Sequence, residues 1–166
     1  MKILVVEDNA RNQQAAKEQL EGHELTIVDE LTEARFALER DMEFDVVLCD
    51  MELPESATCG VVENHHFTGD TSRRDTAAIN EYGFSIALLA IQRGVRRVAM
   101  VTSTFHHHSP MAYMAFLLMR GGTLEIAGGA RLRFEADSMT KMQGEEPKTS
   151  DQYVKDWGGA LARLIS

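Results

Sequence analysis

The fold of this chain is decided by the stretch Val46-Val47-Leu48-Cys49-Asp50-Met51-Glu52-Leu53-Pro54. Its four leading apolar residues, two of them β-branched, predict a short strand that is buried on both faces, as in a parallel sheet. An Asp at the carboxyl end of such a strand lies where open α/β sheets bind ligands. Pro54 then turns the chain away, because a proline cannot continue a central strand. Asp50 is therefore a candidate functional residue, and the alternative is an Asp that only caps the turn after a strand.

A second apolar run also ends in acid. Residues 2–6 (Lys-Ile-Leu-Val-Val) predict another buried strand, and Glu7 and Asp8 follow it directly. If both strands belong to one parallel sheet, three carboxylates meet at the same edge of that sheet. Such a cluster is costly unless a cation holds it, and oxygen-only ligands suit Mg²⁺.

Through residues 3–9 (Ile-Leu-Val-Val-Glu-Asp-Asn) and 45–54 (Asp-Val-Val-Leu-Cys-Asp-Met-Glu-Leu-Pro), the chain resembles the response-regulator receiver family. The resemblance is specific over residues 1–54 and patchy beyond them. It implies that Asp50 accepts a phosphoryl group from a histidine kinase or phosphotransfer protein. It also implies that Glu7, Asp8, Asp50 and the Glu52 carbonyl hold Mg²⁺.

The remaining pattern alternates strands and helices. We expect helices at 10–21, 31–38 and 83–93, strands at 23–29 and 97–102, and two short strands around a glycine turn at 123–127 and 130–135. A closing helix is expected after capping-box residues 149–152, with an apolar stripe formed by Tyr153, Trp157, Ala160, Leu161 and Leu164. The expected fold is a flavodoxin-like, three-layer α/β/α domain with a doubly wound, parallel five-stranded sheet in the order 2-1-3-4-5. The fifth strand is taken as 130–135.

Two segments interrupt this pattern. Residues 55–81 are polar and aperiodic, so we expect an insertion in a single domain spanning 1–166, either a lid or partner-binding element or a tolerated surface loop. Residues 137–149 are predicted to form a polar connector. Residues 110–120 predict a helix with more apolar surface than one face needs, which favours a homodimer.

Two further positions bear on the resemblance. Thr102 ends the strand at 97–102, where receivers carry a hydroxyl that contacts the phosphoryl group, and Ser103 is the near alternative. Receivers also carry a Lys at the end of the fifth strand, and this chain has none there. Arg131 and Lys141 are the substitutes we consider, although neither matches the motif. The apparent loss puts phosphoryl chemistry, or its switch, in doubt.

Five histidines form two clusters, which are His65 and His66, then His106, His107 and His108. The loops after the third and fourth strands emerge side by side above Asp50, so a second metal site of imidazoles and carboxylates is conceivable. Adjacent histidines rarely point the same way. Solvent-exposed loop histidines, or histidines that line the pocket and tune its pH response, are the simpler interpretation.

Composition narrows the function classes. A chain of 166 residues suits one domain, and a net charge of −9 argues against a nucleic-acid-binding surface. No run is long enough to span a membrane, and the start is too short and acidic for a signal peptide, so a cytoplasmic protein is expected. Cys49 and Cys59 suggest no disulfide framework.

The leading hypothesis is a stand-alone receiver-like protein of phosphorelay signalling. Asp50 would be its phosphoacceptor, Thr102 its sensor and Mg²⁺ its cofactor. We expect a signalling domain rather than a turnover enzyme. The alternatives are a pseudo-receiver that binds proteins without being phosphorylated, and a metalloprotein of histidines and carboxylates.

Overall fold

A computed structural model describes residues 1–40, 43–54, 79–80, 82–102, 113, 122–126, 128–135, 139–141 and 153–166. The first half contains β1 (Lys2–Val6), α1 (Ala10–Gln19), β2 (Glu24–Val28), α2 (Leu31–Arg40), β3 (Val46–Cys49) and β4 (Leu53–Pro54). The second half contains β5 (Ile79–Asn80), α3 (Tyr82–Gln92), β6 (Arg97–Val101), β7 (Thr123–Ile126), β8 (Ala130–Glu135), β9 (Met139–Lys141), β10 (Tyr153–Lys155) and α5 (Trp157–Ile165).

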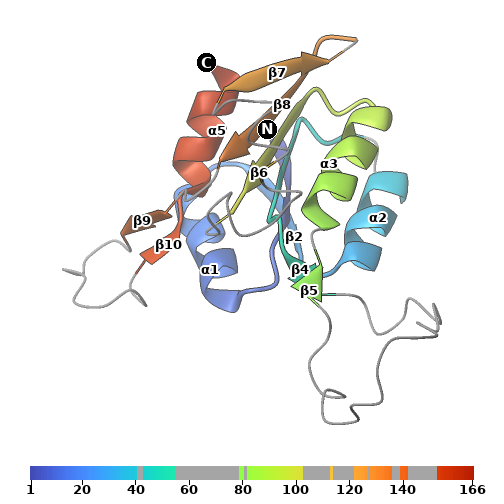
Figure 1. Cartoon of the computed structure of the whole chain (residues 1–166). Helices are drawn as coiled ribbons and strands as arrows, with labels where there is room; N and C mark the ends of the chain where they lie inside the picture. The colour runs from blue at the N-terminus through green and yellow to red at the C-terminus, as the bar shows by residue number, and fades with distance from the viewer. Residues whose placement is uncertain are drawn as a thin grey trace, which may run out of the picture.

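The main sheet has six strands in the order β2-β1-β3-β6-β8-β7 (Figure 1). The pairings from β2 to β8 are all parallel, and β7 is antiparallel to β8. The expected α/β class with a mostly parallel sheet is confirmed. The sheet has one strand more than expected, because 123–126 pairs with β8 through a turn at Gly128 and Gly129, whose φ angles of 85° and 76° favour glycine.

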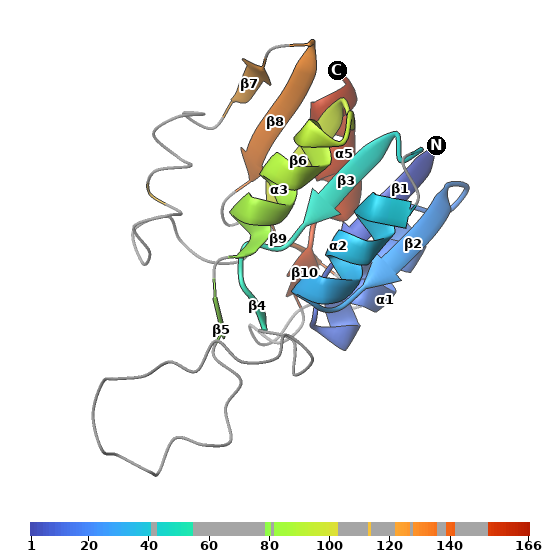
Figure 2. The same ribbon diagram turned by 90° about the vertical axis from the view of Figure 1, so that its right-hand side faces the viewer.

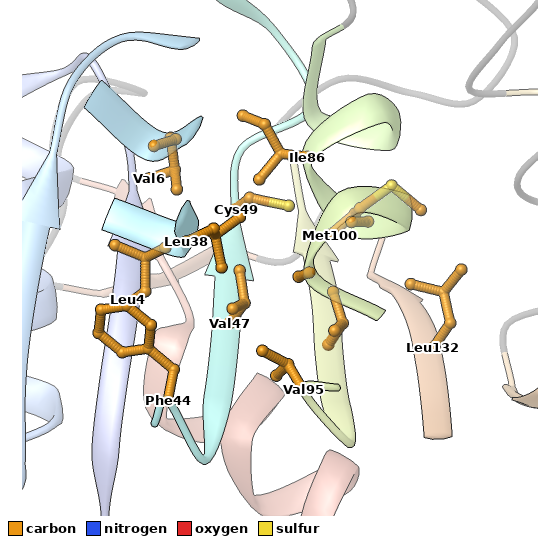
Figure 3. Packing of buried hydrophobic residues seen from close by; sticks show 14 of the residues in the cluster. Leu4, Val6, Leu38, Phe44, Val47, Cys49, Ile86, Val95, Met100 and Leu132 are labelled. Carbon is orange, nitrogen blue, oxygen red and sulfur yellow. The ribbon is translucent and has the colours of Figure 1, made fainter. Parts of the chain in front are cut away.

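Both faces of the sheet are covered by helices, which is why its strands are apolar without interruption. In Figure 2, α2 and α3 lie on the near side of the sheet, and α5 lies on the far side. Alternate strand residues point to the two faces. Figure 3 shows the face under α2 and α3, including Leu4, Leu38, Val47, Ile86 and Met100. The opposite face includes Ile3, Ala16, Leu48, Trp157 and Leu164.

The end of the chain differs from the expectation. The predicted helical stripe began at Tyr153, but residues 153–155 form β10, which pairs antiparallel with β9 inside the expected connector. The last helix begins at Trp157, because Asp156 caps it and accepts a hydrogen bond from the Gly159 N–H at 3.0 Å. A Cβ at Gly159 would overlap that carboxylate, so a larger residue here would force the Asp156 side chain to shift.

Most of the predicted insertion at 55–81 and of the predicted helix at 110–120 lies outside the described residues. The two described ends of the insertion meet, since Leu53 pairs with Asn80 and Pro54 with Ile79. The described residues on either side of 55–78 are therefore brought together in the β4–β5 pair, which begins three residues beyond Asp50. The single domain predicted for 1–166 stays a prediction.

Candidate functional site

The predicted site residues lie at the carboxyl ends of neighbouring parallel strands. Glu7 and Asp8 follow β1, Asp50 follows β3, and Thr102 follows β6. Val6 is paired with Cys49, and Cys49 with Met100, so these strands end at the same edge. Open α/β sheets bind ligands at this edge.

Three of the four predicted Mg²⁺ ligands form a cluster. Glu7, Asp8 and Asp50 each offer a carboxylate oxygen, and these oxygens lie within 4.8 Å of one another. Glu7 is fully buried, Asp50 is 7% exposed and Asp8 is exposed to solvent. This all-oxygen set fits a hard cation such as Mg²⁺. The fourth predicted ligand, the carbonyl of half-buried Glu52, stays a prediction.

Sequence reasoning missed a basic residue of this site. The Nζ atom of Lys155 lies 2.6 Å from Oε2 of Glu7 and 2.6 Å from Oδ2 of Asp50, and the residue is only 1% exposed. It comes from β10, directly before the cap of α5. The signal in the sequence was a lysine that follows two apolar or aromatic residues, Tyr153 and Val154, and stands two positions before Trp157.

Of the two substitutes considered for the lysine, Arg131 does not take this place in the structure, and the side chain of Lys141 lies outside the described parts of the chain. Arg131 lies near the start of β8, paired with Arg97 at the opposite edge of the sheet, and its Nη1 donates to the Leu164 carbonyl at 3.0 Å. Lys141 lies in β9, where it pairs with Tyr153. The site therefore has a lysine, supplied by a segment other than the fifth strand of the sheet.

Glu7 is buried as a carboxylate because each of its oxygens is hydrogen-bonded. Oε1 accepts from the backbone N–H of Asn9 at 3.0 Å and from Nδ2 of Asn12 at 3.3 Å. Oε2 accepts from Lys155. A buried charge is tolerated when it is paired and hydrogen-bonded in this way.

Asp50 is less fully compensated. Its Oδ1 accepts the Met51 N–H at 2.6 Å, and its Oδ2 faces Lys155. Burial raises the pKa of Asp50 to about 6; Glu7 adds to the rise, and Lys155 opposes it. Two buried acids thus share one ammonium, which leaves an excess negative charge that a further cation would balance.

Helix α3 is packed directly against the backbone that carries Asp50. The Gly83 N–H donates to the Met51 carbonyl at 3.1 Å. A Cβ at Gly83 would overlap the Asp50 carbonyl oxygen and lie 2.7 Å from the Met51 Cα. Only a glycine allows this close approach. Gly83 therefore determines how near α3 lies to the backbone of Asp50 and Met51.

Cys49, which precedes Asp50, is a fully buried packing residue. Its Sγ donates to the carbonyl oxygens of Gly83 and Ala99 at 3.5 and 3.7 Å. Burial raises the pKa of the Cys49 thiol, so the nucleophilic thiolate is disfavoured.

Thr102 is 1% exposed, and its backbone N–H donates to the Glu135 carbonyl at 3.0 Å. This places it at the correct edge, one strand from Asp50. Ser103, Cys59 and the five clustered histidines lie outside the described residues. The second metal site therefore stays a prediction.

Comparisons of the chain with protein-family models, curated proteins and solved structures find no match. Its function is accordingly inferred from the chemistry of its own residues. Among the described residues, no helix combines the length and apolar character needed to cross a membrane.

Proposed function

We propose that this chain is a receiver-like signalling protein that accepts a phosphoryl group on Asp50 with the help of Mg²⁺. The observation that carries the proposal is the Lys155 ammonium, which lies 2.6 Å from both Glu7 and Asp50 beside the carboxylate cluster. The resemblance to receivers calls for an acid pair, a strand-end Asp and a lysine. With Lys155, each of these has a counterpart in the chain.

The sheet supports the finer fold proposal as well. The order β2-β1-β3-β6-β8 corresponds to the flavodoxin-like 2-1-3-4-5, with β7 as an added antiparallel edge strand. In that topology the chain reverses direction across the sheet between β1 and β3. Glu7, Asp8 and Asp50 follow these two strands. We therefore propose a doubly wound, three-layer α/β/α domain with its site at the switch point.

The chemistry follows from the position of each group. An Asp50 carboxylate oxygen attacks phosphorus, a new O–P bond forms, and the bond from phosphorus to the donor nitrogen of a phosphohistidine breaks with its electron pair leaving on nitrogen. Lys155 neutralises Asp50 and orients its carboxylate. Thr102 offers a hydroxyl to a phosphoryl oxygen. Glu7, Asp8 and Asp50 would hold Mg²⁺, which would supply positive charge to offset that of the transferred group.

The proposed partners follow from this chemistry. A histidine kinase or phosphotransfer protein supplies the phosphoryl group, and a homodimer formed through the helix predicted at 110–120 passes on the signal. We propose a cytoplasmic location and no nucleic-acid partner, in keeping with the net charge of −9. The protein would act as a phosphoacceptor rather than a turnover enzyme.

The test is incubation with acetyl phosphate and Mg²⁺, followed by intact mass measurement. We expect an adduct of one phosphoryl group that is lost in Asp50→Asn. The matched control is Asp29→Asn, because Asp29 is an exposed acid that follows the neighbouring strand β2. An adduct that persists in Asp50→Asn, or no adduct in the wild-type protein, would contradict the proposal.

One observation favours a second candidate, the unphosphorylated pseudo-receiver that binds proteins. Both oxygens of Glu7 are already hydrogen-bonded, and Lys155 supplies a positive charge without a metal. In this case the ion pair is purely structural. Absence of both an adduct and Mg²⁺ binding by calorimetry would favour this candidate over the first.

A further inference from the structure

Lys155 reaches the site from outside the main sheet. Asp50 is positioned by β3, in the centre of that sheet, whereas β10 is paired with β9 in a separate two-stranded sheet. Figure 1 shows β10 beside α1, with β9 on the other side of β10. The strand pairings that fix Asp50 therefore do not fix Lys155, and other contacts must.

Side chains of α1 bind both main-chain polar groups of Lys155. Its N–H donates to Oδ1 of Asn12 at 3.2 Å, and its carbonyl accepts from Nε2 of Gln19 at 2.9 Å. Asn12 and Gln19 are two helical turns apart and share one face of α1. They hold a segment that lies 143 and 136 residues further along the chain.

The same two side chains make further contacts around the ion pair. Nδ2 of Asn12 donates to Oε1 of Glu7 at 3.3 Å, so this amide bridges the acid and the backbone of the lysine. The main-chain carbonyl of Asn12, next to this side chain, accepts from Nε1 of Trp157 at 2.9 Å. Oε1 of Gln19 accepts the Gly158 N–H at 3.0 Å. Each amide thus uses both its donor and its acceptor.

We propose that Asn12 and Gln19 are positioning residues that place Lys155 against Glu7 and Asp50. A lysine side chain is long and flexible, so its ammonium bridges two acids reliably only if its backbone is held at a fixed distance from them. Asn12 sets that distance directly, because it binds Glu7 and Lys155 at once. The effect on phosphoryl transfer rests on the proposed function, whereas the placement of Lys155 does not.

The first test measures the placement alone. Reductive methylation with formaldehyde and borohydride, read by peptide mass, reports the accessibility of Lys155. We expect Lys155 to be protected in the wild-type protein and to react about tenfold faster in Asn12→Ala/Gln19→Ala, because its segment opens locally more often. Lys17, which is exposed on α1, serves as the internal reference.

The matched control is Gln14→Ala. Gln14 is an exposed amide on the same helix, and its side chain donates to Glu18 at 2.8 Å. This variant should leave Lys155 protected. Gln19→Glu is the milder variant, since it keeps an acceptor for Gly158 and loses the donor to Lys155; it keeps the test decisive if the double variant fails to fold.

The second test uses the rate of adduct formation with acetyl phosphate. We expect Asn12→Ala/Gln19→Ala to lower this rate as much as Lys155→Gln does, with no further loss when the changes are combined, because they act through one group. A purely structural role would give additive losses.

The outcomes separate the two proposals. If Lys155 stays protected in both Asn12→Ala/Gln19→Ala and Gln19→Glu, the positioning role is wrong, whatever the adduct rate. If the wild-type protein forms no adduct, the proposed function fails, and the methylation rates alone decide the positioning role.

Discussion

A buried ammonium group is stable only beside groups of opposite charge, and Lys155 has two such partners. Glu7 and Asp50 both lie 2.6 Å from its Nζ, and Nζ also lies 5.6 Å from the centroid of the Trp157 ring. Desolvation costs each buried charge several kcal/mol, which a good geometry offsets. Removing the lysine would leave two buried acids without their common partner.

We therefore expect Lys155→Met to lower the free energy of unfolding by about 3–5 kcal/mol at pH 8, as for other broken buried pairs. Urea denaturation in EDTA measures this. Lys17→Met is the matched control and should change stability by less than about 0.5 kcal/mol, because Lys17 is exposed. A loss below 1 kcal/mol for Lys155→Met would mean that the pair contributes little to folding.

Asp50 gives a pH prediction. Because burial raises its pKa to about 6, the folded state holds the Asp50 proton more tightly than the unfolded chain does. The stability that this proton contributes is present below about pH 4 and is lost as the pH rises through about 6. Asp50→Asn removes the titration and keeps an acceptor for the Met51 N–H.

The Asn variant should therefore gain stability relative to wild type between pH 4 and pH 8 in EDTA. The gain is at most about 3 kcal/mol, from a pKa that moves from about 4 to about 6. Denaturation curves of both proteins at pH 4 and at pH 8 measure this gain in stability. If the difference between the two proteins is the same at pH 4 and pH 8, the Asp50 pKa is not raised.

At the scale of elements, α3 packs closely against the residues that follow β3 because Gly83 has no side chain. Gly83→Ala would force α3 away from the Asp50–Met51 backbone, and overpacking of this kind costs about 1–3 kcal/mol. Ser85→Ala, on the exposed side of α3, is the control and should be near neutral. Thermal denaturation of the two variants tests this, and equal melting temperatures would contradict the close approach.

The start of α5 depends on one carboxylate. Asp156→Ala should lower stability by about 1 kcal/mol through loss of the cap on Gly159. Asp156→Asn keeps an acceptor oxygen and should retain most of the stability. Chemical denaturation of the pair separates capping from charge, since Asp156 also lies 3.4 Å from Arg163. Equal losses in both variants would assign the effect to that ion pair.

The elements differ in how far the sequence alone predicts them. The central strands β1, β3 and β6 are continuous apolar runs, because both faces of the sheet are covered, and such runs are readable from sequence. The strand β10 cannot be predicted from the sequence in this way. Tyr153, Trp157 and Leu164 also fit a helical period, and only the capping by Asp156 shows that the helix starts later.

The same contrast holds for the site. The meeting of Glu7, Asp8 and Asp50 follows from parallel strands that end at one edge, so the sequence predicts it. The position of Lys155 follows from amide contacts with α1, far away along the chain. No local pattern encodes such contacts, and the search for a lysine at the end of β8 therefore failed.

At the scale of the whole molecule, the site joins the two ends of the chain. Glu7 lies near the start, Lys155 near the end and Asp50 between them, so the ion pair links β1, β3 and the α5 segment. Any cation that binds these acids in the folded state raises the stability of the entire fold by mass action. Lys155 and a divalent ion would then act on the same two acids.

We expect Mg²⁺ to raise the unfolding free energy of the wild-type protein by about 2.7 kcal/mol at a hundred times its dissociation constant. At the same Mg²⁺ concentration, Lys155→Gln should gain more, because the ion then replaces the only cation facing Glu7 and Asp50 among the described residues. Denaturation in Mg²⁺ or in NaCl of equal ionic strength measures both gains.

Asp8→Asn provides the control for this comparison. Asp8 belongs to the carboxylate cluster but is exposed and absent from the Lys155 contacts, so its loss should reduce the Mg²⁺ effect in both backgrounds. Equal gains in wild type and Lys155→Gln would mean that the lysine and the ion bind different groups. If Mg²⁺ raises the unfolding free energy of neither protein, Mg²⁺ does not bind at this site. The acids would then be held together by Lys155 instead of a metal.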